Sequence, residues 1–488
     1  MPQTYIARQY LDSLVSATSD GQVVPWLADS WTISPDGLTY DFTLKKGVEF
    51  TDGTPFDAAA VVANFHQILD PATQSSTDLL YLTSYFKQAV AVDDHVVRIE
   101  LLRPYSPLLI ALSQAFFGME SPKAMARGLA QNCVSPVGTG PFVVKRWNRA
   151  RDVELVGNEN YNSAPANAKH QGPAYLEGVT WRFLKDNTTR YSALAGGQVD
   201  AIFNLPAESQ ESAESNPDLQ LSSFVHSGSP FSLGLNTRSD VFSDVRVRKA
   251  FAHASNAQAA VHSAYGGVYP YEGNTISSGT PSYSAASHDP YPYDPAEAGR
   301  LLDAAGWTGR DSEGYRTKDG RRLTVLLPYN SDSGETPPGD VTILQNIQAE
   351  EKLVGIEVDL EPLDGSSMNS VWGDETKYDA LGTYWNSPTP HVMYIQFSQA
   401  TLDVDNGQNV AFDADPALDD VLLRASATTD PGTQKVLYAQ AQQMVADHAW
   451  AVGLYPVQTR LAVRKELKDV WIETSEGEPV LHDAYLTE

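Results

Sequence analysis

The sequence is poor in the features that carry covalent chemistry. Cys133 is the only cysteine among 488 residues, so the chain can form no internal disulfide and no cysteine-based metal cluster. A lone cysteine is usually a packed small hydrophobic residue, and we predict this for Cys133. The sequence motifs typical of zinc hydrolases, serine hydrolases and nucleotide phosphate loops are also absent. We therefore expect no catalytic residue, no resident metal, no cofactor and no enzymatic activity.

Basic residues and long apolar runs are scarce as well. The chain has 34 Lys and Arg against 61 Asp and Glu, a net charge of −27. This balance argues against partners that present phosphate, both nucleic acid and anionic lipid. No apolar run approaches the roughly 18 residues of a membrane span, and no basic segment followed by an apolar one forms a signal peptide. An apolar content of 42% still supports real cores, and the length predicts two or three domains.

The first sixty residues read as a strand meander. Residues 39–44 alternate polar with apolar or aromatic side chains, the period of a half-buried strand. Asp36-Gly37 is a tight-turn signal before this strand. Asp57 is placed to cap a helix with Val61, Val62 and Phe65 on its apolar face, predicted over 57–68.

Strands and helices alternate along the rest of the chain, which predicts an α/β fold. Helical periodicity also occurs around 105–115, and residues 265–292 read as a long ordered loop. The chain is expected to cross between two lobes near 229–237 and again near 452–459. The predicted hairpin is 141–156; the predicted strands are 179–183, 199–203, 231–236, 323–327, 355–358 and 450–455; the predicted helices are 188–195, 245–254, 294–306, 341–353 and 433–448.

Several short sequence motifs follow one another over more than 450 residues. They include the turn-rich first sixty residues, Pro136-Val137-Gly138-Thr139-Gly140-Pro141-Phe142, Asn158-Glu159-Asn160-Tyr161, Leu235-Asn236-Thr237, the segment from Val245 to Phe251, and Tyr293-Asp294-Pro295 leading to Ala305-Gly306-Trp307. In this order they resemble the extracytoplasmic solute-binding proteins of ABC importers, family 5, in the cluster that takes up peptides, nickel chelates and opines.

The resemblance implies a bilobal periplasmic-binding-protein-like fold of type II, cluster C. Lobe I would span 1–230 with an extra inserted subdomain at about 45–165, lobe II would span 231–455, and 456–488 would return to lobe I. A small ligand would be captured between the lobes by hinge closure and delivered to a membrane ABC permease. The hinge residues expected on the crossing strands are Leu233, Asn236 and Tyr455.

The family also implies a location outside the cytoplasm, periplasmic or lipid-anchored, and a monomer. Its members begin with an export signal and a first strand, and both are missing here, so we expect a trimmed chain or a misplaced start. The alternative hypothesis is that the protein has the same fold but serves as a cell-envelope scaffold or regulator and takes no part in transport.

The segment 381–391 gives the most specific indication of a binding site in the sequence. It follows a predicted strand start at Tyr378 and therefore lies where α/β sheets present ligands. Tyr384, Trp385 and Asn386 would supply two aromatic walls and one polar anchor, which suits a small-molecule site. The competing interpretation is that both aromatic residues belong to the core.

The family comparison narrows the ligand. Peptide-binding relatives carry an Asp that pairs with the ligand amine, and Tyr384 stands at that place, which counts against ordinary short peptides with a free amine. Nickel-binding relatives have aromatics here and a Pro-His pair that matches Pro390-His391, so His391 is a candidate contact. The alternative is that His391 is a surface or helix-capping histidine. Further candidates that border the cleft in the family are Trp31, Phe117 and Met119.

One acidic segment has part of the pattern of a metal site. Asp403 to Gly407 is similar to the start of a calcium loop, but the position of the bidentate Glu falls on Ala414. An acidic surface loop is the preferred interpretation.

Overall fold

The computed structural model describes residues 4–18, 21–73, 75, 77, 81–332, 336–402 and 408–487. The acidic loop 403–407 lies outside these residues. The chain divides into two compact units. Unit 1 comprises Met1–Phe224, Ser426–Thr429 and Thr459–Glu488, and unit 2 comprises Val225–Ala425 and Asp430–Gln458.

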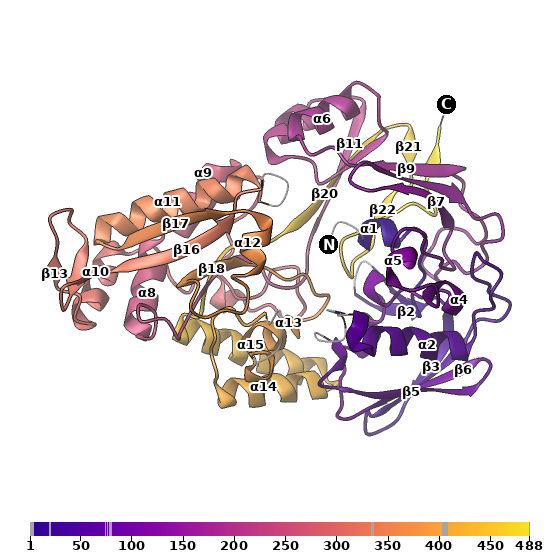
Figure 1. The fold of residues 1–488 in the computed structure, drawn as a ribbon, viewed down its shortest axis with the longest axis horizontal. Coiled ribbons are helices and arrows are strands. Elements are labelled where there is room, and N and C mark those ends of the chain that lie inside the picture. Colours follow the sequence, from indigo (N-terminus) through magenta and orange to yellow (C-terminus); the bar gives the residue numbers. More distant parts are fainter. Residues whose placement is uncertain are drawn as a thin grey trace. The chain divides into compact units, whose positions relative to one another are not determined.

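One sheet of unit 1 has four antiparallel strands. Its order is β3 (Ala28–Ile33), β4 (Thr39–Leu44), β6 (Val96–Leu101) and β5 (Phe86–Asp93). Alternation in β4 buries Tyr40, Phe42 and Leu44, as the sequence predicts. The helix α2 (Ala58–Leu69) packs on β5 and β6 (Figure 1), and the Asp57 carboxylate accepts the Ala60 N–H at 2.8 Å.

Two further sheets complete most of unit 1. The strands β7 (Phe142–Asn148), β8 (Asp152–Gly157) and β9 (Gly178–Arg182) form an antiparallel sheet. In the other, β20 (Gln458–Arg464) lies between β10 (Ala201–Phe203) and β11 (Leu219–Val225). The helix α6 (Asn187–Ala195) leads into β10. Apolar side chains from both ends of the chain share the adjoining core: Ile6, Phe142, Val153, Leu155, Leu461, Val463 and Leu481.

The Gly138-Thr139-Gly140 motif packs closely against the backbone of Tyr10. A Cβ atom on Gly138 would lie 2.0 Å from the Tyr10 carbonyl oxygen, and one on Gly140 would lie 2.6 Å from the Tyr10 carbonyl carbon. The Gly140 N–H donates to that same oxygen at 3.1 Å. The glycines therefore allow this loop to lie directly against the N-terminal segment.

Unit 2 is built around two strand groups. The strand β12 (Phe231–Leu235) lies between β18 (Ala380–Thr383) and β19 (Ala451–Tyr455) and is antiparallel to both. The strands β16 (Thr324–Asn330) and β17 (Glu357–Leu363) are parallel and are joined by α11 (Pro338–Val354), a β-α-β crossover. The helices α8 (Val245–Ala254), α9 (Ala257–Tyr265) and α10 (Pro295–Ala304) lie with α11 around these strands (Figure 1). This alternation confirms the α/β class.

A second core in unit 2 gathers the C-terminal helices α13 (Val392–Phe397), α14 (Pro416–Ala427) and α15 (Pro431–His448). Its buried side chains include Met393, Leu418, Leu422, Tyr438, Val445 and Trp450. The loop that precedes α10 has only a 3₁₀ turn, Ala285–Ser287, and is fixed to α15 because Asn274 donates to Gln442 at 3.0 Å. The predicted ordered loop is confirmed.

The remaining elements are short. The helices are α1 (Thr4–Ala7), α3 (Leu108–Ala111), α4 (Pro122–Met125), α5 (Leu129–Asn132), α7 (Gln210–Glu214) and α12 (Gly365–Asn369), with 3₁₀ turns η1 (Pro71–Thr73), η3 (Ala115–Phe117), η4 (Ala207–Ser209) and η6 (Gln399–Thr401). The strands are β1 (Val15–Ala17), β2 (Val23–Pro25), β13 (Gly309–Arg310), β14 (Arg316–Lys318), β15 (Arg321–Arg322), β21 (Leu467–Lys468), β22 (Trp471–Ile472), β23 (Pro479–Val480) and β24 (Tyr485–Leu486).

Two local predictions were wrong. The helical periodicity around 105–115 yields only the single turn α3 and the 3₁₀ turn η3. Pro104 and Pro107 keep the residues before them out of the helical conformation, so the helix cannot begin before Leu108. Cys133 is exposed rather than packed, since it caps the short surface helix α5.

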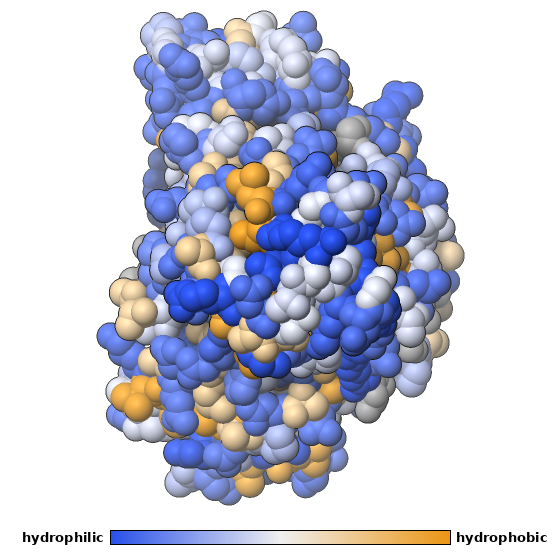
Figure 2. All heavy atoms as spheres, turned by 90° about the vertical axis from the view of Figure 1, so that its left-hand side faces the viewer, coloured by the Kyte–Doolittle hydropathy of each residue, from blue (hydrophilic) through white to orange (hydrophobic). Residues whose placement is uncertain are grey.

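The molecular surface carries many polar residues. The face drawn in Figure 2 is mainly hydrophilic, and its apolar groups form small separate patches. Exposed apolar residues such as Leu353 and Val436 are of the isolated kind that any soluble surface carries. Among the described residues, we find no helix with the length and hydrophobicity to cross a bilayer.

Candidate functional site

The segment after β18 is held by the loop that leads into β12. The Trp385 N–H donates to the Ser229 hydroxyl at 2.7 Å, and the Ser229 N–H donates to the Trp385 carbonyl at 2.9 Å. The Ser387 N–H donates to the Ser227 carbonyl at 3.0 Å. These bonds fix the backbone of 385–387 within unit 2.

Gly228 is the close contact that makes this arrangement possible. Its φ is +118°, and a Cβ atom there would lie 2.1 Å from the Trp385 carbonyl oxygen. The Thr280 hydroxyl accepts from the Gly228 N–H at 2.8 Å and donates to the Gly228 carbonyl at 2.9 Å. Glycine is required both for the backbone angle and for the space, and no sequence motif had indicated it.

Three polar atoms of the segment stand out. Thr383 Oγ1, Trp385 Nε1 and Asn386 Oδ1 are buried, and none of them has a hydrogen-bond partner within the described part of the chain. Together they offer one N–H donor, one amide acceptor and one hydroxyl. Each of these atoms is therefore available to pair with a polar group from outside the described residues.

The aromatic residues of the segment differ in exposure. The Tyr384 side chain is 49% exposed, whereas Trp385 is half-buried and packs against the C-terminal core of unit 2. His391 is fully buried and its ring stacks on Tyr394 with centroids 5.1 Å apart. Burial lowers the pKa of His391 to about 3, so its imidazole is neutral.

The other three predicted contacts lie in unit 1. Trp31 is half-buried in β3, with its ring centroid 6.4 Å from that of Phe42. Phe117 and Met119 are buried in the core. Tyr384, Trp385, Asn386 and His391 are thus residues of unit 2, whereas Trp31, Phe117 and Met119 are residues of unit 1.

The three predicted hinge residues belong to the sheet of unit 2. Leu233 is fully buried in β12 and pairs with Val452 and Gly382. The Asn236 side chain donates to the carbonyls of Glu375 and Tyr378, both at 2.8 Å, and so braces the end of β12. Their role in movement stays a prediction.

Tyr455, the third of these residues, takes part in a buried carboxylate cluster. Its hydroxyl and that of Tyr265 each donate to Asp340 Oδ1 at 2.6 Å. Burial raises the pKa of Asp340, while the two phenols oppose that rise. Gly339 allows this contact, since a Cβ there would lie 2.3 Å from the Tyr265 ring.

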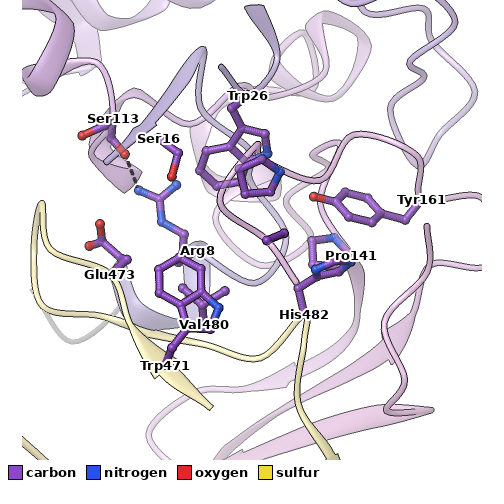
Figure 3. Close-up of a pocket in the computed structure, with 12 residues that line it drawn as sticks. Arg8, Ser16, Trp26, Ser113, Pro141, Tyr161, Trp471, Glu473, Val480 and His482 are labelled. Carbon is purple, nitrogen blue, oxygen red and sulfur yellow. Dashed lines mark hydrogen bonds between the residues drawn. The ribbon is translucent and has the colours of Figure 1, made fainter. Parts of the chain in front are cut away.

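Unit 1 contains a small cavity (Figure 3). Its walls include Arg8, Trp26, Tyr161, Trp471, Glu473 and His482. The Arg8 guanidinium donates to the Ser113 carbonyl at 2.7 Å and forms a buried ion pair with Glu478. The volume is about 20 Å³, enough for a water molecule but not for a solute of peptide size.

Comparisons with known proteins cover almost the whole chain. The glutathione-binding protein GsiB of Salmonella choleraesuis is 28% identical over 480 residues, which are 97% of this chain and 88% of the relative. GsiB of Escherichia coli O157:H7 is 27% identical over 478 residues, with the same coverage.

Two solved structures are similar at 25% identity. NikA from Brucella suis, in complex with Fe(III)-EDTA, has a TM-score of 0.85 and covers 99% of this chain and 95% of its own. The periplasmic binding protein DppA from Helicobacter pylori, in complex with the peptide STSA, has a TM-score of 0.82 and covers 98% and 93%. The expected periplasmic-binding-protein fold is confirmed.

The family profile decides the class. The profile of bacterial extracellular solute-binding proteins, family 5 (middle), matches residues 22–403. The prediction that this is a solute receptor of the ABC-importer type, not an enzyme, and that it acts outside the cytoplasm is thereby confirmed. The chain belongs to the bacterial extracellular solute-binding proteins of family 5.

Proposed function

We propose that this protein captures a peptide-like or chelate-like solute at the segment Tyr384–Asn386 and delivers it to a membrane permease. The observation that carries this proposal is the buried, unpartnered set formed by Thr383 Oγ1, Trp385 Nε1 and Asn386 Oδ1. These three residues adjoin the half-exposed Tyr384 in sequence, and the 227–229 loop holds the backbone of the segment.

The chemistry of the segment favours an amide-bearing solute. An indole N–H pairs with a carbonyl or carboxylate oxygen, and an amide oxygen pairs with an N–H donor. A peptide bond carries both groups. Tyr384 adds an aromatic face but no charge, so a free ammonium group would gain no ion pair from this segment.

The relatives support a solute of this size. Those named above bind glutathione, the peptide STSA or the chelate Fe(III)-EDTA. All are compact and polar, and glutathione and the peptide contain amide groups. Glutathione, whose ammonium group would have to pair outside this segment, is the first probe to use, followed by tetrapeptides and metal chelates.

We further propose that solute binding draws the two units together. The chain passes between them at Phe224-Val225 and Gln458-Thr459, and also at both ends of the short unit 1 segment Ser426–Thr429. Chain links of this kind can act as hinges. The closed, loaded form must bind the permease better than the empty form for delivery to have a driving force. The protein would act as a monomer, without nucleic acid, in the periplasm or tethered to the outer face of the membrane.

The test combines ligand discovery with a shape measurement. Purified protein is denatured, and the released small molecules are identified by mass spectrometry. Refolded protein is then titrated with the identified solute, with glutathione as the initial probe, and followed by calorimetry and small-angle scattering. Saturable binding with a smaller radius of gyration supports the proposal. Absence of a released solute, together with no response to peptides or chelates, would favour the envelope scaffold instead.

A further inference from the structure

Two histidines and one aspartate meet in unit 1, far from each other in sequence. His170 Nδ1 lies 3.0 Å from Asp483 Oδ1, and these residues are 313 positions apart. His482 Nδ1 lies 3.3 Å from the same oxygen. One possible ligand atom from each of the three residues lies within 4.8 Å of the other two.

The hydrogen bonds around the cluster orient both histidine rings. His170 Nε2 lies 3.0 Å from the Pro173 carbonyl oxygen, and His482 Nε2 lies 2.8 Å from the Gly172 carbonyl oxygen. A carbonyl oxygen only accepts, so Nε2 is the donor in both contacts. Nδ1 is therefore the nitrogen that each ring places toward Asp483.

The carboxylate is held as firmly as the rings. The Lys169 N–H lies 3.1 Å from both oxygens of Asp483, and the Trp471 indole N–H donates to Oδ2 at 3.2 Å. These donors hold both carboxylate oxygens in place. His482 Nδ1, in contrast, is buried and has no hydrogen bond within the described residues.

We propose that His170, His482 and Asp483 form a site for a divalent transition metal, with Zn²⁺ as the reference ion. Two imidazole nitrogens and one carboxylate are a common zinc ligand set. Backbone carbonyls behind both rings, and N–H donors behind the carboxylate, are the outer partners that such ligands usually have. The Nδ1–Oδ1 separations of 3.0 and 3.3 Å suit atoms that share one ion at about 2.1 Å.

Metal binding requires one ring to turn. The two imidazoles are stacked, with centroids 4.1 Å apart and only 8° between their planes. Lone pairs in parallel planes do not converge on one point, so a bound ion would separate the rings. His170 is the ring that can move, because its side chain is 15% exposed while that of His482 is 3% exposed. The His170 ring also stacks on Tyr175, which is itself 60% exposed.

This site is independent of the solute segment, which lies in unit 2. Zn²⁺ bound here would link the 169–173 loop to the C-terminal stretch, since His170 belongs to the former and His482 and Asp483 to the latter. The expected effect is stabilisation of unit 1, because an ion that binds only the folded state raises its stability.

The test is a calorimetric titration of the metal-stripped, full-length protein with Zn²⁺. We expect one site that disappears or weakens by more than about tenfold in His170→Gln. His448→Gln is the matched control, because His448 lies 4.0 Å from a single carboxylate, Asp415, and is half-exposed. Tyr384→Ala serves as a second control, because it alters the solute segment without touching the cluster.

Two results would overturn the proposal. One is a wild-type protein with no one-site Zn²⁺ isotherm. The other is a site that survives in His170→Gln or vanishes in Tyr384→Ala. Thermal unfolding with and without Zn²⁺ gives a second readout, in which only proteins with an intact cluster should gain stability.

Discussion

The carbonyl oxygen of Trp385 lies 2.1 Å from the place where a Cβ atom of Gly228 would stand. This contact joins the loop before β12 to the segment after β18 and leaves no room for any side chain. Since φ at this position is +118°, a substitution would also strain the backbone.

We predict that Gly228→Ala destabilises unit 2 and displaces Trp385. Backbone strain and the steric contact together should cost about 2–4 kcal/mol of unfolding free energy. Urea unfolding followed by tryptophan fluorescence would measure the loss. Gly373→Ala is the control, because φ is +77° there but no atom lies within 4 Å of the added Cβ. Equal losses in the two variants would show that the Trp385 contact is unimportant.

A second prediction concerns the aromatic residues of the proposed solute segment. Tyr384→Ala and Trp385→Ala should each weaken solute binding by about 1–3 kcal/mol, as expected for the loss of an aromatic contact. Calorimetry with the identified solute, or with glutathione as a probe, would measure this. Tyr175→Ala, an exposed tyrosine of unit 1, should leave affinity unchanged. Unaltered binding in both site variants would move the site elsewhere.

The Asp340 cluster gives a prediction about stability rather than binding. Tyr265→Phe or Tyr455→Phe removes one 2.6 Å hydrogen bond to Asp340, which should cost about 1–2 kcal/mol. Asp340→Ala should cost more, because two buried hydroxyls lose their acceptor at once. Chemical unfolding of the three variants would test this order. A loss in Asp340→Ala no larger than in either phenylalanine variant would contradict it.

Acid should destabilise unit 2 through its buried histidines. Burial lowers the pKa of His226 to about 4 and that of His391 to about 3, against 6.5 for a free imidazole. Between pH 6.5 and 4 the unfolded chain therefore binds protons that the folded chain does not. Their contribution to stability is complete above pH 6.5 and falls as the pH decreases, by about 1.4 kcal/mol per pH unit for each histidine.

The measurement is the midpoint of thermal unfolding from pH 8 to pH 4.5. His391→Phe, which keeps an aromatic ring beside Tyr394, should flatten the acid slope. His448→Gln should not, because that side chain is 47% exposed. An unchanged slope in His391→Phe would remove His391 from the acid response.

Local sequence signals predicted the regular elements well. Residues 39–44 alternate and form β4, Asp57 caps α2, and the predicted helix 341–353 lies within α11. These elements are governed by side-chain periodicity and capping, which are visible within a few residues. Near residue 108 the same reasoning failed, because two prolines precede Leu108 and only one helical turn forms after them.

The candidate site could be predicted only in part. An aromatic and amide segment after a strand was visible in sequence, but its fixation by Ser229 and Gly228 was not, because those residues come from 156 positions earlier. His170 and Asp483 are further apart still. Pairings of this kind depend on the packing of distant segments, and no local spacing encodes them.

The position of β20 has a consequence for biosynthesis. This strand, Gln458–Arg464, lies between β10 and β11 in a sheet whose outer strands were synthesised more than two hundred residues earlier. The N-terminal half cannot complete its architecture while the ribosome is still adding the last thirty residues. Premature termination near residue 450 should therefore leave both early strands with an open edge, which is a template for aggregation.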